Sequence, residues 1–360
     1  MNINAYLAHQ NTLGRPWTKE ETEIYAKENK KMLEEINKTL RPSRGKKTGK
    51  VAIFCPGQIG DTAQVMGILK YWDVMFLNKE CIWFINAPNS DLLRYSNVSE
   101  VRPWPWAGNG LNAGEPDHWP YLCLPNNKLN LELAKTRKDT ADLEDGYFPA
   151  THQVPSEKRE GLEYSLVSKK IFGVPDRWEW HPRLYWHDDE KKMIKEFAGT
   201  FHKNRRTVIL ENFAGSGQSP FFTVDTTKRI MELCRKKLGA CNFVFCSHKH
   251  LGGKDNCGLD NKELFGNEDG FFSAAHFTPR QVALINDYAD LFIGISSGIS
   301  VVTSAWELRG TPKIQWCGSR ICSTNAIANG EFILAESEFK TREVAEKDFF
   351  NKLNEILNQL

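Results

Sequence analysis

A segment with two glycines and one acid could form a ligand site where a buried strand ends. In FCPGQIGDTAQVMGILKYW, residues 54–72, the apolar run 51–55 ends at a loop that holds Gly57 and Gly60, and Asp61 follows. Glycine lets a ligand approach the backbone closely. Apolar residues then recur at three- and four-residue steps, which predicts a helix that begins near Asp61. The Asp61 carboxylate is therefore either a functional group or a first-turn acid that stabilises the helix.

A second segment could bind an anion. In ADLFIGISSGISVVTSAWELRGTPKIQWCG, residues 289–318, a buried strand ends at Ser296, Ser297 and Gly298, and a helical pattern follows at once. The first N–H groups of a helix lack intrahelical partners and suit a diphosphate. The hydroxyls of Ser297 and Ser300 could add donors, although Ser297 could also be only the helix N-cap.

The elements around these segments alternate between strands and helices. We expect strands near residues 51–55, 81–85, 207–213, 242–247, 290–295 and 311–318, with helical patterns between them. Among these patterns, a helix-like piece lies near residues 91–95, one helix ends at Gly173, one begins at Thr278 and Pro279, and one covers residues 299–310. This order predicts an α/β protein of the GT-B type, with two Rossmann-like, doubly wound domains facing each other across a cleft. No G-x-G-x-x-G fingerprint follows the first strand and no P-loop motif occurs, which argues against a P-loop NTPase.

The chain divides into four predicted parts. Residues 1–45 form a helical extension and basic linker, 46–202 an N-terminal acceptor domain, 203–340 a C-terminal donor domain, and 341–360 a last helix that could reach back across the domains. The stretch 103–160 lacks periodicity but contains Trp104, Trp106 and Trp119, which would suit either a sugar-binding region or ordinary loop packing.

Composition limits the classes of function. The formal net charge is +2 with 26% charged residues, so no strong overall field favours nucleic acid or an anionic membrane. No signal peptide or membrane span is expected. The nine cysteines are scattered and contain no CxxC pair, which predicts reduced core residues in a cytoplasmic protein without a structural zinc site. His248 and His250 are not expected to bind metal.

Three segments, in this order, resemble the signature regions of the heptosyltransferase-like family of GT-B glycosyltransferases, glycosyltransferase family 9. They are residues 51–72, VILENFAGSGQSP at 208–220, and residues 277–318. Enzymes of this family transfer a sugar from a nucleotide donor to a saccharide acceptor. The resemblance covers residues 50–318 and is weakest between 103 and 160.

The resemblance implies roles for individual residues. Asp61 would be the catalytic base, in an acceptor loop with Gly57, Gln58 and Gly60. The donor site would comprise Ser216, Gln218, Ser219, Lys249, Ser296, Ser297, Gly298, Ile299 and Ser300. Two departures are visible: Ser296 stands where the family usually has Asp, and no basic residue follows the glycine loop at 215–217. Lys249 or Arg320 would then supply the positive charge.

The function implied is transfer of a sugar from a nucleotide-diphosphate donor to a saccharide such as lipopolysaccharide, capsule or a related glycan. We expect inversion at the anomeric carbon and no cofactor or metal, because no D-x-D motif occurs. Alternatives are a transferase acting on modified DNA bases, a nucleotide-sugar epimerase on the same fold, and an inactive nucleotide-sugar-binding module.

Overall fold

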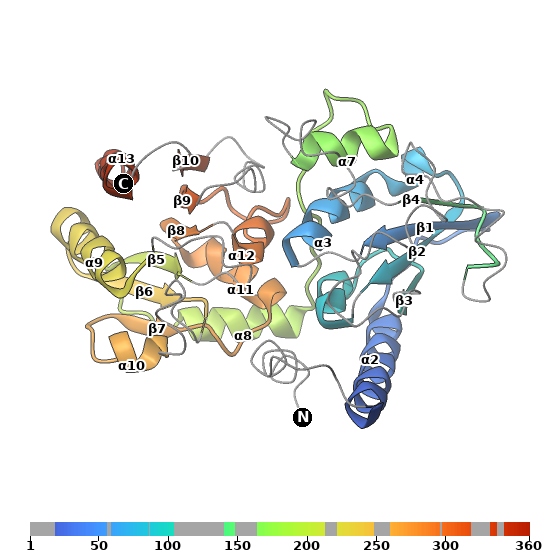
Figure 1. Cartoon of the computed structure of the whole chain (residues 1–360), viewed down its shortest axis with the longest axis horizontal. Coiled ribbons are helices and arrows are strands. Elements are labelled where there is room, and N and C mark those ends of the chain that lie inside the picture. Colours follow the sequence, from blue (N-terminus) through green and yellow to red (C-terminus); the bar gives the residue numbers. More distant parts are fainter. Residues whose placement is uncertain are drawn as a thin grey trace. The chain divides into compact units, whose positions relative to one another are not determined.

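The chain forms two compact α/β units. The structure, a computed structural model, describes residues 19–55, 59–85, 87–103, 140–147, 164–212, 222–247, 260–295, 297–317, 332–336 and 342–360. One unit comprises Met1–Gln153 and Ser168–Trp178, and the other Val154–Val167 and Glu179–Leu360. Each contains a parallel sheet flanked by helices, which confirms the predicted fold class (Figure 1).

The first unit has four strands, in the order β3 (Glu100–Pro103), β2 (Lys79–Ile85), β1 (Gly49–Cys55) and β4 (Asp145–Tyr147). Val51 on β1 pairs with Cys81 on β2 and with Asp145 on β4. Because β1 lies between β2 and β4, the strand order reverses at β1. In such sheets ligands bind outside the carboxyl ends of the strands at this switch point.

The helical segment after β1 is not one continuous helix. It consists of α3 (Ile59–Val65), a 3₁₀ turn η1 (Met66–Lys70) and α4 (Trp72–Met75). The predicted apolar face is nevertheless buried, since Val65, Ile68, Leu69 and Trp72 are each at most 3% exposed. After β2, the helical piece expected near residues 91–95 overlaps the 3₁₀ segment η2 (Ala87–Leu93) only in part.

The N-terminal extension is only partly solvated. Helix α2 (Lys19–Thr39) buries Leu33 and Ile36. The Asn37 side chain donates to the Val101 carbonyl at 2.8 Å and accepts from the Val101 N–H at 2.7 Å. The Asn37 amide thereby makes the two hydrogen bonds that a neighbouring strand would make to Val101. Helix α2 in this way covers part of the edge of the sheet at β3 (Figure 1).

Helix α7 (Tyr164–Phe172) ends as the sequence predicts. Gly173 follows it with φ +68°, a conformation that other residues rarely adopt. The Phe172 ring packs on Tyr147 of β4, with ring centroids 5.4 Å apart. The end of α7 therefore packs on the first unit.

The second unit has six parallel strands. Their order is β10 (Phe332–Glu336), β9 (Lys313–Cys317), β8 (Leu291–Ile295), β5 (Arg206–Glu211), β6 (Cys241–Phe245) and β7 (Phe271–Ser273). Three strands lie on either side of the switch between β5 and β8, as in the doubly wound sheet of dinucleotide-binding folds. The interiors of β5, β6 and β8 are buried and mainly apolar, although that of β6 includes Asn242.

Helices cover both faces of this sheet (Figure 1). Helices α9 (Val224–Leu238) and α13 (Arg342–Leu357) pack on one face, and α8 (Asp188–Ala198), α11 (Pro279–Ile285) and α12 (Gly298–Val302) on the other. Helix α10 (Asn261–Phe265) places Phe265 against Phe245 of β6. The start of α11 is as predicted, with Thr278 as N-cap and Pro279 in the first turn.

The division between the units differs from the predicted boundary at residues 202 and 203. Helix α8, expected in the first domain, belongs to the second unit. Its Ile194 packs in the same cluster as Ile209 and Val282, and its Glu190 pairs with the buried Arg280 of α11. Helix α13 also belongs to the second unit, where Ala345, Phe349 and Leu353 are buried against the sheet.

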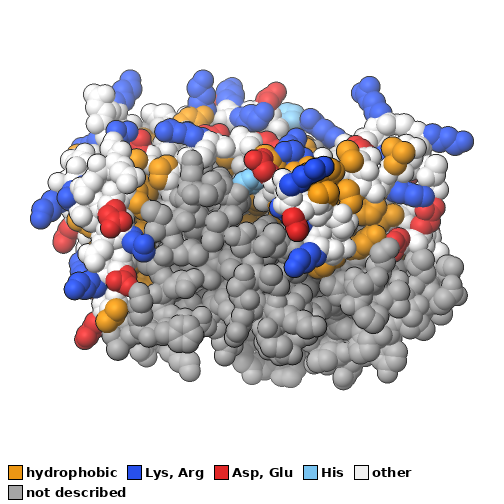
Figure 2. Space-filling model, turned by 90° about the horizontal axis from the view of Figure 1, so that it is seen from above, with side chains coloured by type: hydrophobic (Ala, Val, Ile, Leu, Met, Phe, Trp, Pro, Cys, Tyr) orange, Lys and Arg blue, Asp and Glu red, His pale blue; other side chains and the backbone are white. Residues whose placement is uncertain are grey.

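Other features of the described residues bear on the class of protein. Cys55, Cys81, Cys234, Cys241 and Cys246 are buried free thiols, and burial raises the pKa of each of the last four. No described helix is both long and apolar enough to cross a bilayer. Figure 2 shows Lys and Arg side chains spread over the described part of one face with Asp and Glu among them.

Candidate functional site

Asp61 lies just beyond the carboxyl end of β1, at the switch point of the first sheet. It is the third residue of α3, half-exposed, and the acid of the helix's first turn. The next residue, Thr62, is fully buried, and its hydroxyl lies 3.7 Å from the Cys55 sulfur at the end of β1. This contact fixes the start of α3 on the strand. Gly60 also lies in α3, whereas Gly57 and Gln58 are outside the described residues.

The Ser297–Gly298 turn lies at the switch point of the second sheet. Ser297 is the N-cap of α12, and its hydroxyl accepts from the Ser300 N–H at 3.3 Å. The Ser300 hydroxyl accepts from the Ser297 N–H at 3.3 Å and donates to the Ser297 carbonyl at 2.6 Å. Both hydroxyls therefore stabilise the turn itself.

The N–H groups of Gly298 and Ile299 lie outside this capping box. They belong to the first turn of α12, a helix of five residues. A phosphate beyond the end of β8 could accept hydrogen bonds from these two N–H groups. Ser300 is fully buried beneath this turn. In this turn Ser297 is the N-cap, which was one of its two predicted roles, while Gly298 and Ile299 remain the proposed anion-binding positions.

Glu211 is a further candidate, and it was not predicted from the sequence. It ends β5, is 1% exposed, and lies opposite Gly294 of β8. A Cβ added at Gly294 would lie 3.0 Å from the Glu211 Cβ, so this glycine leaves room for the start of the Glu211 side chain. The Ser247 hydroxyl reaches both Glu211 oxygens, at 3.2 and 3.3 Å. Burial, followed by the charge of Glu211, raises the pKa of Cys246.

Two buried amides continue this polar edge. Asn212 follows Glu211, and its amide exchanges hydrogen bonds of 2.9 and 3.0 Å with that of Asn261. Asn261 also donates to the Ser247 carbonyl at 2.9 Å. On the other side, Gln315 of β9 donates to the Ile295 carbonyl at 3.2 Å, just before the Ser297 turn. The one signal in the sequence was the polar pair Glu211-Asn212 at the end of an apolar run.

The remaining predicted positions are not all described. Ser216, Gln218, Ser219, Lys249 and Ser296 lie outside the described residues, as do His248, His250, Arg320 and the tryptophans at 104, 106 and 119. The structure brings Ser297, Gly298, Ile299 and Ser300 together in one turn of the second unit. Gly60 and Asp61 lie together in the first unit.

Glu307 is an alternative acid on the second unit. The predicted helix over residues 299–310 ends at Val302, so Glu307 lies in the turn that follows. Its carboxylate pairs with the Arg183 guanidinium at 2.9 Å and accepts from the Leu184 N–H at 3.3 Å. These contacts give it a structural role.

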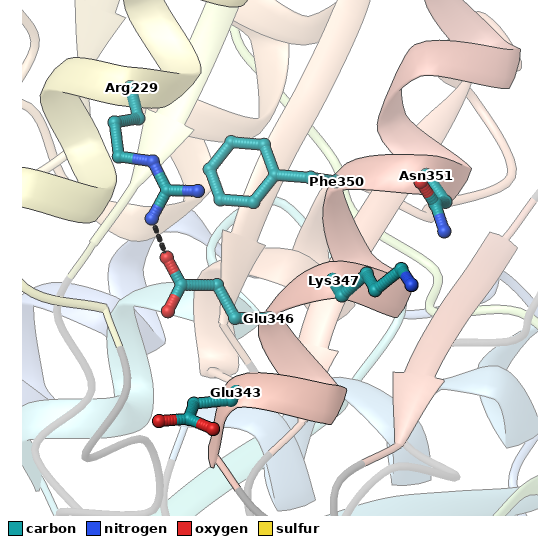
Figure 3. Close-up of a pocket in the computed structure, with 6 residues that line it drawn as sticks. All are labelled: Arg229, Glu343, Glu346, Lys347, Phe350 and Asn351. Atoms are coloured by element: carbon teal, nitrogen blue, oxygen red, sulfur yellow. Dashed lines mark hydrogen bonds and ion pairs between the residues drawn. The ribbon is translucent and has the colours of Figure 1, made fainter.

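A pocket of about 360 Å³ lies between α9 and α13 in the second unit. Its lining comprises Arg229, Glu343, Glu346, Lys347, Phe350 and Asn351 (Figure 3). Arg229 forms an ion pair with Glu346, and its guanidinium lies 4.4 Å from the centre of the Phe350 ring. Arg229 therefore joins the two helices, and none of the predicted site residues lines this pocket.

The described residues contain no group of three or more His, Cys, Asp or Glu side chains arranged to hold a metal ion.

No protein-family model and no curated protein sequence matches the chain. Solved structures do match. The glycosyl transferase family 9 protein from Veillonella parvula DSM 2008 is 12% identical with a TM-score of 0.59, over 87% of this chain and 98% of that one.

Two further structures match over most of this chain. E. coli ADP-heptose lps heptosyltransferase II is 13% identical with a TM-score of 0.54, over 86% of this chain and 99% of its own. TibC from enterotoxigenic E. coli H10407, described as a bacterial iron-containing dodecameric glycosyltransferase, is 13% identical with a TM-score of 0.52, over 88% of this chain and 77% of its own. At these identities the similarity shows the fold, so the chain has the heptosyltransferase-like GT-B fold of glycosyltransferase family 9.

Proposed function

We propose that this protein is a glycosyltransferase that moves a hexosyl or heptosyl group from a nucleotide-diphosphate donor to a saccharide acceptor. The observation that carries the proposal is the match of the fold over most of the chain to glycosyltransferases. Asp61 and the Ser297–Gly298 turn support it, because each lies where a doubly wound sheet binds its ligand.

The reaction needs a base for the acceptor. In the proposed step the Asp61 carboxylate takes the proton of an acceptor hydroxyl while that oxygen forms a bond to the anomeric carbon of the donor. The bond from the anomeric carbon to the diphosphate oxygen breaks, and the leaving nucleoside diphosphate keeps the electron pair. Attack opposite the leaving group inverts the anomeric centre.

The leaving group needs stabilisation. The N–H groups of Gly298 and Ile299 would donate to the diphosphate oxygens, where negative charge develops as the bond breaks. The positions proposed to complete the donor site are Ser216, Gln218, Ser219, Lys249 and Ser296. Gly57 and Gln58 would join Gly60 in the acceptor loop.

The donor and acceptor are proposed by class. The name of E. coli ADP-heptose lps heptosyltransferase II includes both ADP-heptose and lps. We propose a nucleotide sugar and a lipopolysaccharide, capsule or related glycan for this chain. Since Ser296 replaces the usual Asp of the family, the sugar need not be a heptose. We propose a cytoplasmic location on the basis of the buried free thiols, and transfer without a metal.

Incubation with a panel of ADP-, GDP- and UDP-sugars tests the proposal. One donor should be hydrolysed slowly, with release of its nucleoside diphosphate, and faster when a suitable glycan is added. An epimerase would instead convert the sugar and release no nucleoside diphosphate. Failure to bind or cleave any donor of the panel would contradict the proposal.

A further inference from the structure

The first unit exposes two aliphatic side chains at the end opposite Asp61. Val74 is 71% and Leu77 72% exposed, the largest values among the exposed large hydrophobic residues of the described chain. They lie in α4 and in the connection to β2, whose first residue is Lys79. This is the amino end of the sheet, whereas Asp61 follows the carboxyl end of β1.

Packing on the inner side of this connection turns both side chains outward. Trp72 is buried, and its indole N–H donates to the Lys79 carbonyl at 3.1 Å. The Phe76 ring lies against Trp72 at 4.4 Å and against Tyr147 of β4 at 5.5 Å. Since Trp72 and Phe76 are held inward, the exposure of Val74 and Leu77 follows from the fold itself.

The basic linker runs along the same connection. Ser43 donates to Asp73 at 2.8 Å, Lys47 lies 3.8 Å from the same carboxylate, and the Thr48 N–H donates to the Asn78 carbonyl at 2.9 Å. The Arg41 N–H also donates to the Ser96 carbonyl at 2.8 Å. The linker is therefore fixed to the first unit.

These contacts bring positive charge beside the two aliphatic side chains. Arg44 and Lys46 are exposed and are next to Ser43 and Lys47, while Val74 and Leu77 are next to Asp73 and Asn78. Residues 41–50 contain five Lys and Arg and no acid. Lys47 is offset by Asp73 and Lys50 by Asp142. Although the chain as a whole is nearly neutral, Arg41, Arg44 and Lys46 give this linker a net positive charge.

We propose that Arg44, Lys46, Val74 and Leu77 form a docking surface for an anionic lipid bilayer. Exposed aliphatic side chains enter the boundary between headgroups and acyl chains, and neighbouring Lys and Arg meet the lipid phosphates. Together the two contributions give reversible attachment, with the carboxyl end of the sheet away from the lipid.

A lipid surface fits these residues better than a nucleic acid does. Single-stranded nucleic acids are held by aromatic side chains that stack on bases, and duplexes by polar contacts to phosphates and base edges. Neither gives a use for exposed Val74 and Leu77. A bilayer uses both the charges and the aliphatic groups.

Co-sedimentation of the full chain with vesicles tests the proposal. The protein should bind vesicles of mixed phosphatidylcholine and phosphatidylglycerol, and much more weakly vesicles of phosphatidylcholine alone. Arg44→Ser with Lys46→Ser should weaken binding by about fivefold for each charge, and binding should weaken further as salt is raised. Val74→Ser with Leu77→Ser should weaken it by about tenfold or more.

Matched controls separate docking from general effects. Val344→Ser removes an exposed aliphatic side chain from α13, and Lys203→Ser with Lys236→Ser removes two exposed charges from the second unit. These variants should bind vesicles as the unchanged chain does, and all variants should keep the circular dichroism spectrum.

Three results would overturn the proposal. One is equal binding to both kinds of vesicle, or none. Another is binding that the four substitutions leave unchanged. The third is that the chain does not bind vesicles and the four substitutions instead disrupt another interaction. That interaction would be a dimer seen by light scattering, or binding to a DNA duplex seen by fluorescence anisotropy. None of these measurements depends on the proposed transferase activity.

Discussion

The ion pair between Glu190 and Arg280 should decide how firmly α8 is held on the second unit. The Arg280 side chain is 1% exposed and that of Glu190 13%. One guanidinium nitrogen donates to the Tyr185 carbonyl and to Glu190, each at 2.7 Å, and the other donates to the second Glu190 oxygen. Removing one partner from a buried pair leaves a charge without compensation, which is strongly destabilising.

Glu190→Gln removes the charge and keeps an oxygen that can accept hydrogen bonds. Breaking a buried pair costs about 3–5 kcal/mol. We expect the lower end, about 3 kcal/mol, because Arg280 keeps its bond to Tyr185. For a unit of this size each kcal/mol changes the melting temperature by about 2–4 °C, which gives a loss of roughly 6–12 °C.

The same pair predicts a pH dependence. Burial alone would raise the pKa of Glu190, but the hydrogen bonds and charge of Arg280 lower it below its ordinary value. The stabilisation is therefore present above the pKa of glutamate in the unfolded chain, about 4.3, and is lost as the pH falls through the lower folded pKa. Glu190→Gln should remove this part of the acid sensitivity.

Thermal unfolding by circular dichroism, with hydrogen exchange of α8 and α11, measures the effect. Glu196→Gln is the matched control, since Glu196 is exposed on the same helix and should change stability by at most about 0.5 kcal/mol. If Glu190→Gln unfolds at the same temperature as this control, the pair does not hold α8 and the reasoning is wrong.

Three further predictions concern the second unit and the reaction. In excess chelator the enzyme should keep most of its turnover. Complete loss of turnover that is restored by adding metal would show that a metal is required. Gly298→Asp should weaken the calorimetric binding of whichever of ADP, GDP or UDP the unchanged chain binds, because the new carboxylate would face the phosphate; equal affinity would move the donor elsewhere. Gly294→Val should lower the free energy of unfolding by about 1–3 kcal/mol, since even a Cβ would lie 3.0 Å from Glu211 and from the Phe292 ring; an unchanged urea midpoint would contradict the close packing.

The strands and the two loops that follow them could be predicted from local patterns. The run 51–55 is apolar throughout, and the glycines and Asp61 directly after it predict a strand–loop–helix unit. Thr278 and Pro279 likewise predict the start of α11. These signals are local, so they do not depend on where the rest of the chain lies.

Helix α12 shows where local patterns fail. The pattern 299–310 predicts a helix, but the helix ends at Val302. The hydroxyls of Thr303 and Ser304 donate to the Ser300 carbonyl at 2.9 and 3.3 Å and so compete with the helical backbone bonds. Lys313 of β9 then donates to the Thr303 carbonyl at 2.6 Å. The last contact comes from another strand and has no local signal.

Long-range pairs account for the other differences. The place of α8 depends on Arg280, which is 90 residues from Glu190 in the chain. Glu211 gains its burial from β6 and β8, which are its neighbours only in the folded sheet. Strands β3, β4, β7 and β10 were not predicted, and each of them lies at an edge of its sheet.

The turnover of Asp61→Asn, measured with the donor that the nucleotide-sugar panel identifies, tests the proposed mechanism most directly. Asn preserves the size of the side chain, and loss of a first-turn charge lowers helix stability by no more than about 1 kcal/mol. If Asp61 is the base, turnover should fall by about two orders of magnitude or more, with donor affinity and melting temperature little changed. A normal turnover would contradict the account and leave Asp61 as an acid that only stabilises the start of α3.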